Sequence, residues 1–246
     1  MAKIPVDPRA AHAEAVADAK RLMRLSRTAA LATLDPATGA PLTTLVGVAS
    51  DFDGAPIFLM STLARHTQHL ASDPRASVLL TEEPERGDPL NHPRITLNGR
   101  IERAAELRVR ARYLQRNPKA KLYADFADFT FFRLAVESVH FNGGFGRADA
   151  LSPGDILGPR EGEAAFIEAE ARVLDWVNGL GDVALARLAG RSSGRQAWRA
   201  VGLDAEGLDL AAGGRAARIW FDSPARDEAD WRARLEVFIA SRKKYE

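Results

Sequence analysis

The chain has 246 residues, of which 46% are hydrophobic and 27% charged, which is enough apolar material for a packed core and excludes wholesale disorder. Cysteine is absent and no apolar run reaches about eighteen residues, which excludes disulfides, thiolate metal sites, cysteine nucleophiles and a membrane-spanning helix. The 34 basic residues nearly balance the 33 acidic ones, and a net charge of +1 argues against a nucleic-acid-binding protein.

The N-terminal part of the chain is expected to be mainly β. Residues 1–7 lack the apolar region of a secretory signal, so we expect a cytoplasmic protein. Helical spacing of apolar residues predicts a first helix over 8–26. Strands are predicted in chain order over 28–34, 41–50, 56–61, 75–81, 94–102 and 134–141, with helices over 63–72 and 104–116. Strands in this number usually close on themselves, so residues 1–150 predict a six-stranded antiparallel barrel or sandwich with flanking helices.

A change of pattern divides the chain near its middle. Residues 151–162 are rich in proline and glycine and are predicted to be a linker. Beyond them the pattern predicts a helix of about fifteen residues from Glu163. Further helices are predicted over 182–189 and 227–242, with short strands over 197–203, 207–211 and 215–221. Residues 163–246 therefore predict a separate small α+β domain.

The junction between the strand at 56–61 and the helix after it carries several anion-binding groups. Free backbone amides and the positive end of the helix dipole favour an anion at a helix start. Arg65 can bind a phosphate bidentately, Ser61 and Thr67 add hydroxyl donors, and His66 adds a further donor. The simpler alternative is an ordinary surface helix capped by Ser61 or Thr62.

Other chemical signatures are weak. His66 and His69 share a helix face, but two ligands without nearby carboxylates make a poor metal site, and no metal is predicted. His92 lies in a loop, and His140 lies in a strand. The sequence contains no dinucleotide-binding, P-loop, zinc-protease or serine-hydrolase motif. An enzyme of this sequence would therefore depend on a cofactor for its chemistry.

The order of these segments resembles a known superfamily. TAALATL, DPATGAP, TTLVGVAS, DFDG, PIFLMS, STLARHTQHLASDPRASVLL and HPRITLNGRIE follow one another as in the pyridoxamine 5′-phosphate oxidase-like, FMN-binding split barrels. HFNGGFGRA and the second domain resemble the heme-utilisation branch, whose members bind or degrade heme. The resemblance implies a six-stranded split barrel and a homodimer with FMN between the subunits.

The resemblance also implies residue roles. The phosphate would be held by Arg65, His66 and Thr67, with Met60 and Ser61 beside it. Thr44, Leu45 and Val46 would line the flavin, and Arg94 would lie near the ring. Gly144 and Arg147, within the glycine-rich 143–147 segment, would approach from the partner subunit, because glycine allows close backbone contact.

The chain departs from the family pattern at three places. His66 stands where many oxidase relatives have lysine, which predicts weaker, pH-dependent FMN binding. The basic substrate-binding tail of true pyridoxamine phosphate oxidases is missing, which argues against vitamin B6 oxidation. Of the histidine-rich motif of heme relatives only Asn178 remains, and no histidine follows His140.

Three functions remain open from the sequence. The first is an FMN-dependent oxidoreductase with an unidentified small-molecule substrate. The second is a heme-binding or heme-degrading oxygenase, in which His92 or His140 would have to replace the lost ligands. The third is a flavin- or heme-binding protein without turnover.

Overall fold

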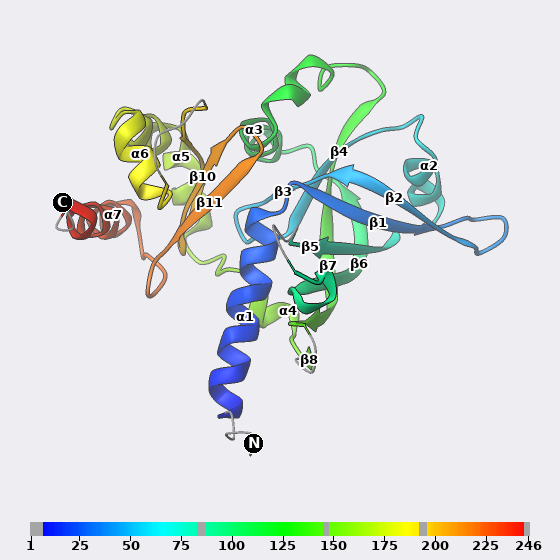
Figure 1. Cartoon of the computed structure of the whole chain (residues 1–246). Helices are drawn as coiled ribbons and strands as arrows, with labels where there is room; N and C mark the ends of the chain where they lie inside the picture. Colours follow the sequence, from blue (N-terminus) through cyan, green and yellow to red (C-terminus); the bar gives the residue numbers. More distant parts are fainter. Residues whose placement is uncertain (1–6, 83–86, 145–147, 192–195, 244–246) are drawn as a thin grey trace.

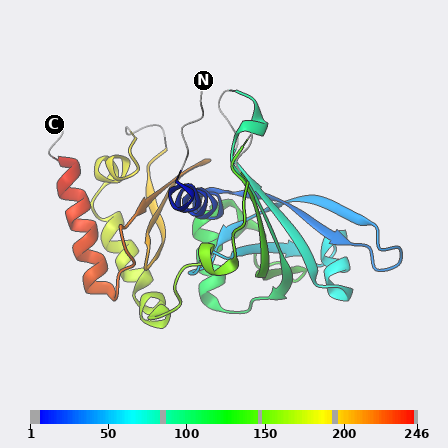
Figure 2. The same ribbon diagram turned by 90° about the horizontal axis from the view of Figure 1, so that it is seen from below.

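The computed structural model describes residues 7–82, 87–144, 148–191 and 196–243. A curled sheet with its helices forms one body, and a small sheet with three helices forms a second (Figure 1). The first helix, α1 (Pro8–Leu25), lies between the two bodies (Figure 2). Among the described helices, none is long and apolar enough to cross a membrane.

Six long strands and two short ones make the larger sheet. They are β1 (Thr28–Leu34), β2 (Pro41–Gly47), β3 (Ala49–Ser50), β4 (Pro56–Ser61), β5 (Arg75–Thr81), β6 (Arg94–Arg103), β7 (Phe129–Asn142) and β8 (Ala148–Asp149). Their order is β2-β1-β5-β6-β7-β4-β3, with β8 paired to β7, and every pairing is antiparallel. The expected antiparallel split barrel with flanking helices is thereby confirmed.

Alternating burial explains why the strands curl around a core. Along β1 and β5 every second residue is buried, and Leu31, Val78 and Leu97 of β6 are fully inaccessible on the inner face. A bulge lies between Asn98 and Gly99, where β6 pairs with β7. A Cβ atom on Gly99 would lie 1.9 Å from the Ala135 carbonyl oxygen, so the two strands can approach here only at glycine.

Two helices connect the strands. The helix α2 (Arg65–Ser72) joins β4 to β5, and α3 (Leu107–Arg116) follows β6. Short 3₁₀ turns, η1 (Pro89–Asn91) and η2 (Pro118–Leu122), complete the connections. The predicted strand at 134–141 is the second half of β7, because the aromatic residues from Phe129 onward pair with β4.

The predicted linker packs against the barrel. It contains the one-turn helix α4 (Pro153–Ile156), which begins with a capping box between Ser152 and Asp155. Leu151 and Ile156 belong to the barrel core, and the Gly158 amide donates to the Asp53 carbonyl at 2.8 Å. Residues 151–158 are therefore held in place despite their proline and glycine content.

The C-terminal body is the expected α+β unit. Its sheet has the order β11-β10-β9, from β9 (Arg199–Asp204), β10 (Gly207–Ala212) and β11 (Arg215–Trp220). The helices are α5 (Glu163–Asn178), α6 (Asp182–Leu188) and α7 (Glu228–Lys243). Trp198 and Trp231 are each 1% exposed and anchor its core.

Buried ion pairs join the two bodies. Arg24 of α1 contacts Asp204 at 3.0 Å, and Arg218 contacts the same carboxylate at 2.7 Å. Arg112 of α3 contacts Glu170 of α5 at 2.5 Å and donates to the Leu203 carbonyl at 2.8 Å. Such pairs leave little freedom for the bodies to separate, because an unpaired buried charge is costly.

Candidate functional site

The start of α2 is shaped by a hydrogen-bonded turn. The Ser61 hydroxyl donates to the Asp128 carboxylate at 2.5 Å and accepts from the Leu63 amide at 3.1 Å. The Thr62 amide donates to the Asp128 carbonyl at 2.7 Å. The N-cap residue is Ala64, which makes no side-chain cap. Neither Ser61 nor Thr62 caps the helix, and Ser61 fixes the turn in this structure.

Three groups at this helix start are available to an anion. The amides of Arg65 and His66 precede the helical hydrogen-bond ladder, as the first amides of a helix do. The Arg65 side chain is exposed. The Thr67 side chain is 6% exposed, and its hydroxyl oxygen is buried without a hydrogen-bond partner. Buried hydroxyls are normally hydrogen-bonded, so this one is an unused donor at the first turn.

His66 is attached to the neighbouring strand. The Thr44 hydroxyl of β2 lies 3.1 Å from its Nδ1. Burial lowers the pKa of His66 below its usual value, and the nearby His69 lowers that pKa further. His66 is therefore neutral at pH 7, and Arg65 is the cation of this helix start.

His69, one turn further along α2, is buried at 5% exposure. Its Nδ1 lies 3.2 Å from the Thr33 hydroxyl, and its Nε2 lies 3.8 Å from the Asp35 carboxylate. This histidine therefore connects α2 to the β1–β2 hairpin. Among the described residues, no group of three or more histidine, aspartate and glutamate side chains could hold a metal ion.

Alternation along β2 separates the other predicted flavin contacts. Thr44 faces α2, whereas Leu45 points outward and is 77% exposed. The Val46 and Met60 side chains belong to the buried barrel core. Of these four residues, only Thr44 presents its side chain to the start of α2.

Arg94 and Gly144 lie at the other end of the sheet. Arg94 pairs with Thr81 at the end of β5, whereas α2 leads into the start of β5 at Arg75. These two ends of β5 are six residues apart, which corresponds to roughly 20 Å along a strand. The Arg94 guanidinium donates to the Leu90 carbonyl at 3.0 Å. Within one chain Arg94 therefore does not meet Arg65.

Gly144 lies against η1 of the same chain. Gly144 has φ +109°, and a Cβ atom there would lie 2.5 Å from the Asn91 carbonyl oxygen. This close approach gives the glycine a structural reason that the sequence did not reveal. Arg147 lies outside the described residues.

One contribution to the site was missed in the sequence. Asp128 fixes the turn before α2 from 67 residues away, and it lies in an aromatic segment for which no element was predicted. No local sequence signal identifies it as the partner of Ser61. Asn178, the residue that remains of the histidine-rich motif, lies outside this site and holds the C-terminal sheet: its side-chain oxygen accepts from the Ala200 amide at 2.9 Å, and its side-chain nitrogen donates to the Ala200 carbonyl at 3.2 Å.

Comparison with known families agrees with this architecture. Residues 10–156, more than half of the chain, match the family described as CREG, beta-barrel. The chain belongs to the CREG beta-barrel family. The matched region of this CREG-type chain runs from α1 to the end of α4, and so includes the whole larger sheet and α2.

Solved structures resemble the CREG-type chain over both bodies. The protein Atu2129 of Agrobacterium tumefaciens, of unknown function, is 35% identical, with a TM-score of 0.80 over 98% of this chain and 100% of that one. A heme-binding protein from Mycobacterium smegmatis is 26% identical, with a TM-score of 0.52 over the same shares.

A curated relative matches part of the chain. The non-canonical heme oxygenase HOZ of Arabidopsis thaliana, a chloroplastic protein, is 37% identical over 113 residues, which are 45% of this chain. The match spans about a third of that relative, 34% of its length. The expected resemblance to split-barrel and heme-utilisation proteins is confirmed.

Proposed function

We propose that this chain is an FMN-binding flavoprotein, with the flavin phosphate at the start of α2, and that it acts as an oxidoreductase on a small molecule. The unpartnered Thr67 hydroxyl supports the proposal most directly. A phosphate oxygen would satisfy this donor, while Arg65 and the first helix amides would supply further donors. The residues present therefore fit a phosphate group.

The protein's part in such a site is binding and orientation. Arg65 would neutralise the phosphate from the exposed side, and the bond between Thr44 and His66 would keep β2 against the helix start. A bound flavin would supply two-electron redox chemistry. Turnover of a donor by the reconstituted flavoprotein would distinguish an oxidoreductase from a protein that only binds flavin.

A comparison of FMN with riboflavin tests the phosphate site. The two ligands share the ring and differ in the phosphate, so FMN should bind more tightly by at least the factor of about 10–150 expected for one hydrogen bond to a charged group. Quenching of flavin fluorescence gives both affinities, and added inorganic phosphate should weaken FMN alone. Equal affinity for both flavins, or no binding of either, would contradict the proposal.

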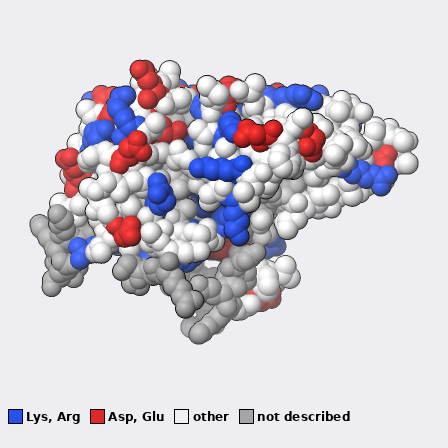
Figure 3. Space-filling model, turned by 90° about the horizontal axis from the view of Figure 1, so that it is seen from above, with Lys and Arg blue, Asp and Glu red and all other residues white. Residues whose placement is uncertain are grey.

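We also propose a homodimer that forms through the outer face of the barrel sheet. The strand register aligns residues side by side across β2, β1, β5, β6 and β7 on this face. One such row consists of four uncharged residues followed by a histidine on β7: Leu45, Ala30, Leu79, Thr96 and His140. The next row is also uncharged: Thr43, Ala32, Ser77, Asn98 and Ser138. Toward the hairpin, the molecular surface seen in Figure 3 is also mostly uncharged. An uncharged sheet face of this extent is suited to a second copy of the chain.

A charge placed in this face should separate the subunits. Wild-type protein is expected to have twice the chain mass by light scattering, and Ala32→Glu is expected to be monomeric, because an interface excludes an unpaired carboxylate. Ala37→Glu, in the exposed hairpin turn, is the matched control and should stay dimeric. A monomeric wild-type protein would overturn this assignment.

Heme binding is the second candidate, and the two heme-related proteins favour it. In the single chain His140 is exposed on the outer sheet face, at the β7 end of the row described above, where it can serve as the iron ligand if the second subunit leaves that end open. Hemin titration should then give a Soret band that His140→Ala shifts or abolishes, whereas His12→Ala should not. Bleaching of that band with ascorbate would identify heme degradation. If hemin binds no more tightly than to an unrelated protein, this candidate fails.

A further inference from the structure

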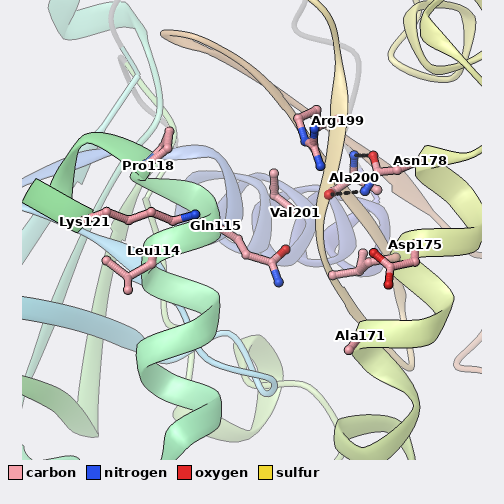
Figure 4. Close-up of a pocket in the computed structure, with 11 residues that line it drawn as sticks. Leu114, Gln115, Pro118, Lys121, Ala171, Asp175, Asn178, Arg199, Ala200 and Val201 are labelled. Atoms are coloured by element: carbon pink, nitrogen blue, oxygen red, sulfur yellow. Dashed lines mark hydrogen bonds between the residues drawn. The ribbon is translucent and has the colours of Figure 1, made fainter. Parts of the chain in front are cut away.

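A cleft of about 480 Å³ lies between the two bodies. None of the residues that line it belongs to α2. It is bounded by α3 and η2 of the barrel body and by α5 and β9 of the C-terminal body (Figure 4). Its volume falls within the range of small-molecule sites, which occur preferentially where domains meet.

The floor of the cleft is apolar. Leu114, Leu174 and Val201 are each less than a tenth exposed and line the cleft from three different elements. Asn178 also lines it, but its amide group is engaged by the Ala200 backbone. The β9 wall of the cleft is therefore fixed to α5, so the side of the cleft that the C-terminal body forms is preformed.

The rim of the cleft carries two cations from opposite bodies. Lys121 of η2 and Arg199 of β9 extend toward the same space above Val201 (Figure 4). In the described parts of the chain neither forms an ion pair, in contrast to Arg24, Arg112 and Arg218. Asp175 is the one carboxylate in the lining, so the charged lining residues sum to +1.

We infer that this cleft binds a small organic anion, whose carboxylate or phosphate is held between Lys121 and Arg199 and whose apolar part covers Val201. Such a ligand would contact both bodies and would stabilise their arrangement by mass action. This site is separate from the proposed flavin site, and it does not depend on flavin binding.

The fluorescent anion 8-anilinonaphthalene-1-sulfonate tests this inference, with N-phenyl-1-naphthylamine as its uncharged analogue. The sulfonate should saturate one site per chain and bind more tightly than the analogue. Lys121→Ala and Arg199→Ala should each weaken the sulfonate about 3–10-fold, the effect of one partly exposed charge, without weakening the analogue. Lys119→Ala is the matched control, because this neighbouring exposed lysine does not line the cleft.

Two further variants locate the binding. Ala171→Trp places a large side chain in the cleft from an exposed position of α5, and it should abolish sulfonate binding while the circular dichroism stays native. Arg65→Met should leave sulfonate binding unchanged, which separates this cleft from the start of α2. The inference is overturned if the sulfonate does not saturate, if the analogue binds equally well, or if Ala171→Trp and the two alanine variants bind like wild type.

Discussion

Replacing Asp204 with asparagine is expected to lower the free energy of unfolding by about 3–5 kcal/mol at pH 7, the cost of breaking a buried ion pair from one side. Asp204 is 2% exposed and is shared by Arg24 of α1 and Arg218 of β11. The substitution leaves two buried guanidinium groups without their common carboxylate. Because Arg24 belongs to the barrel body, the loss should destabilise both bodies together.

The pKa of Asp204 predicts how the loss of stability in Asp204→Asn changes with pH. Burial alone would raise the pKa of Asp204, but Arg218 and Arg24 offset burial and hold that pKa at about 2. A pKa depressed in the folded state means that the stabilisation is complete above the unfolded value of 3.8 and is lost as the pH falls toward 2. The difference in the free energy of unfolding between wild type and Asp204→Asn should therefore be constant near neutrality and shrink between pH 4 and pH 2.

Urea unfolding followed by circular dichroism and by tryptophan fluorescence measures both effects. Fluorescence reports mainly the C-terminal body, which contains Trp198 and Trp231, so coincident transitions would show that the two bodies unfold as one. Asp222→Asn is the control, since this carboxylate is exposed, and it should change stability by less than about 0.5 kcal/mol. If Asp204→Asn changed the free energy of unfolding as little as Asp222→Asn does, the buried ion pairs would contribute little to stability.

Much of the barrel could be predicted because its strands carry their own pattern. β1, β4 and β5 have the predicted bounds, since each is a short apolar run ended by turn residues. The first half of β7 was missed because its aromatic residues give no clear period, and pairing with β4 makes them a strand. Pairing between distant segments is the information that local sequence lacks.

The same limit applies to the arginines. Arg24 occupies a helix that the sequence predicts only from the spacing of its apolar residues, yet its guanidinium is buried against the second body. Its carbonyl acceptors at Asp51 and Phe52 and its partner Asp204 are distant in sequence. Arg65 could be singled out because a helix start is a local feature, whereas the structural arginines are defined by tertiary contacts.

At the candidate site, too, local features could be predicted from the sequence and tertiary contacts could not. The order of strand, hydroxyl residues and helix predicts a helix start that includes Arg65 and Thr67, although the helix begins at Arg65 and not at residue 63. The engagement of Ser61 by Asp128 and the outward direction of Leu45 depend on the assembled sheet. A second subunit would be needed to bring Arg94 or Gly144 near Arg65, because the register of β5 and β6 keeps them apart in one chain.

Arg65→Met is expected to weaken FMN binding about 10–150-fold, which corresponds to about 1.5–3 kcal/mol for a hydrogen bond to a charged group. Methionine keeps the length of the side chain and removes the cation that the phosphate requires. Riboflavin, which lacks the phosphate, should bind Arg65→Met and wild type equally. Arg9→Met, an exposed arginine on α1, is the matched control and should leave both affinities unchanged.

Thr67→Val tests whether the Thr67 hydroxyl contacts the ligand or supports the fold, because a ligand contact predicts lower FMN affinity without lower stability. Valine has nearly the shape of threonine and removes a buried hydroxyl that has no partner, so stability without ligand should stay equal or rise. FMN affinity should fall about 3–10-fold, because the phosphate loses one donor. Thermal melting with and without FMN measures both quantities. A variant that melts lower and binds FMN as wild type does would show that the hydroxyl supports the fold and does not face the phosphate.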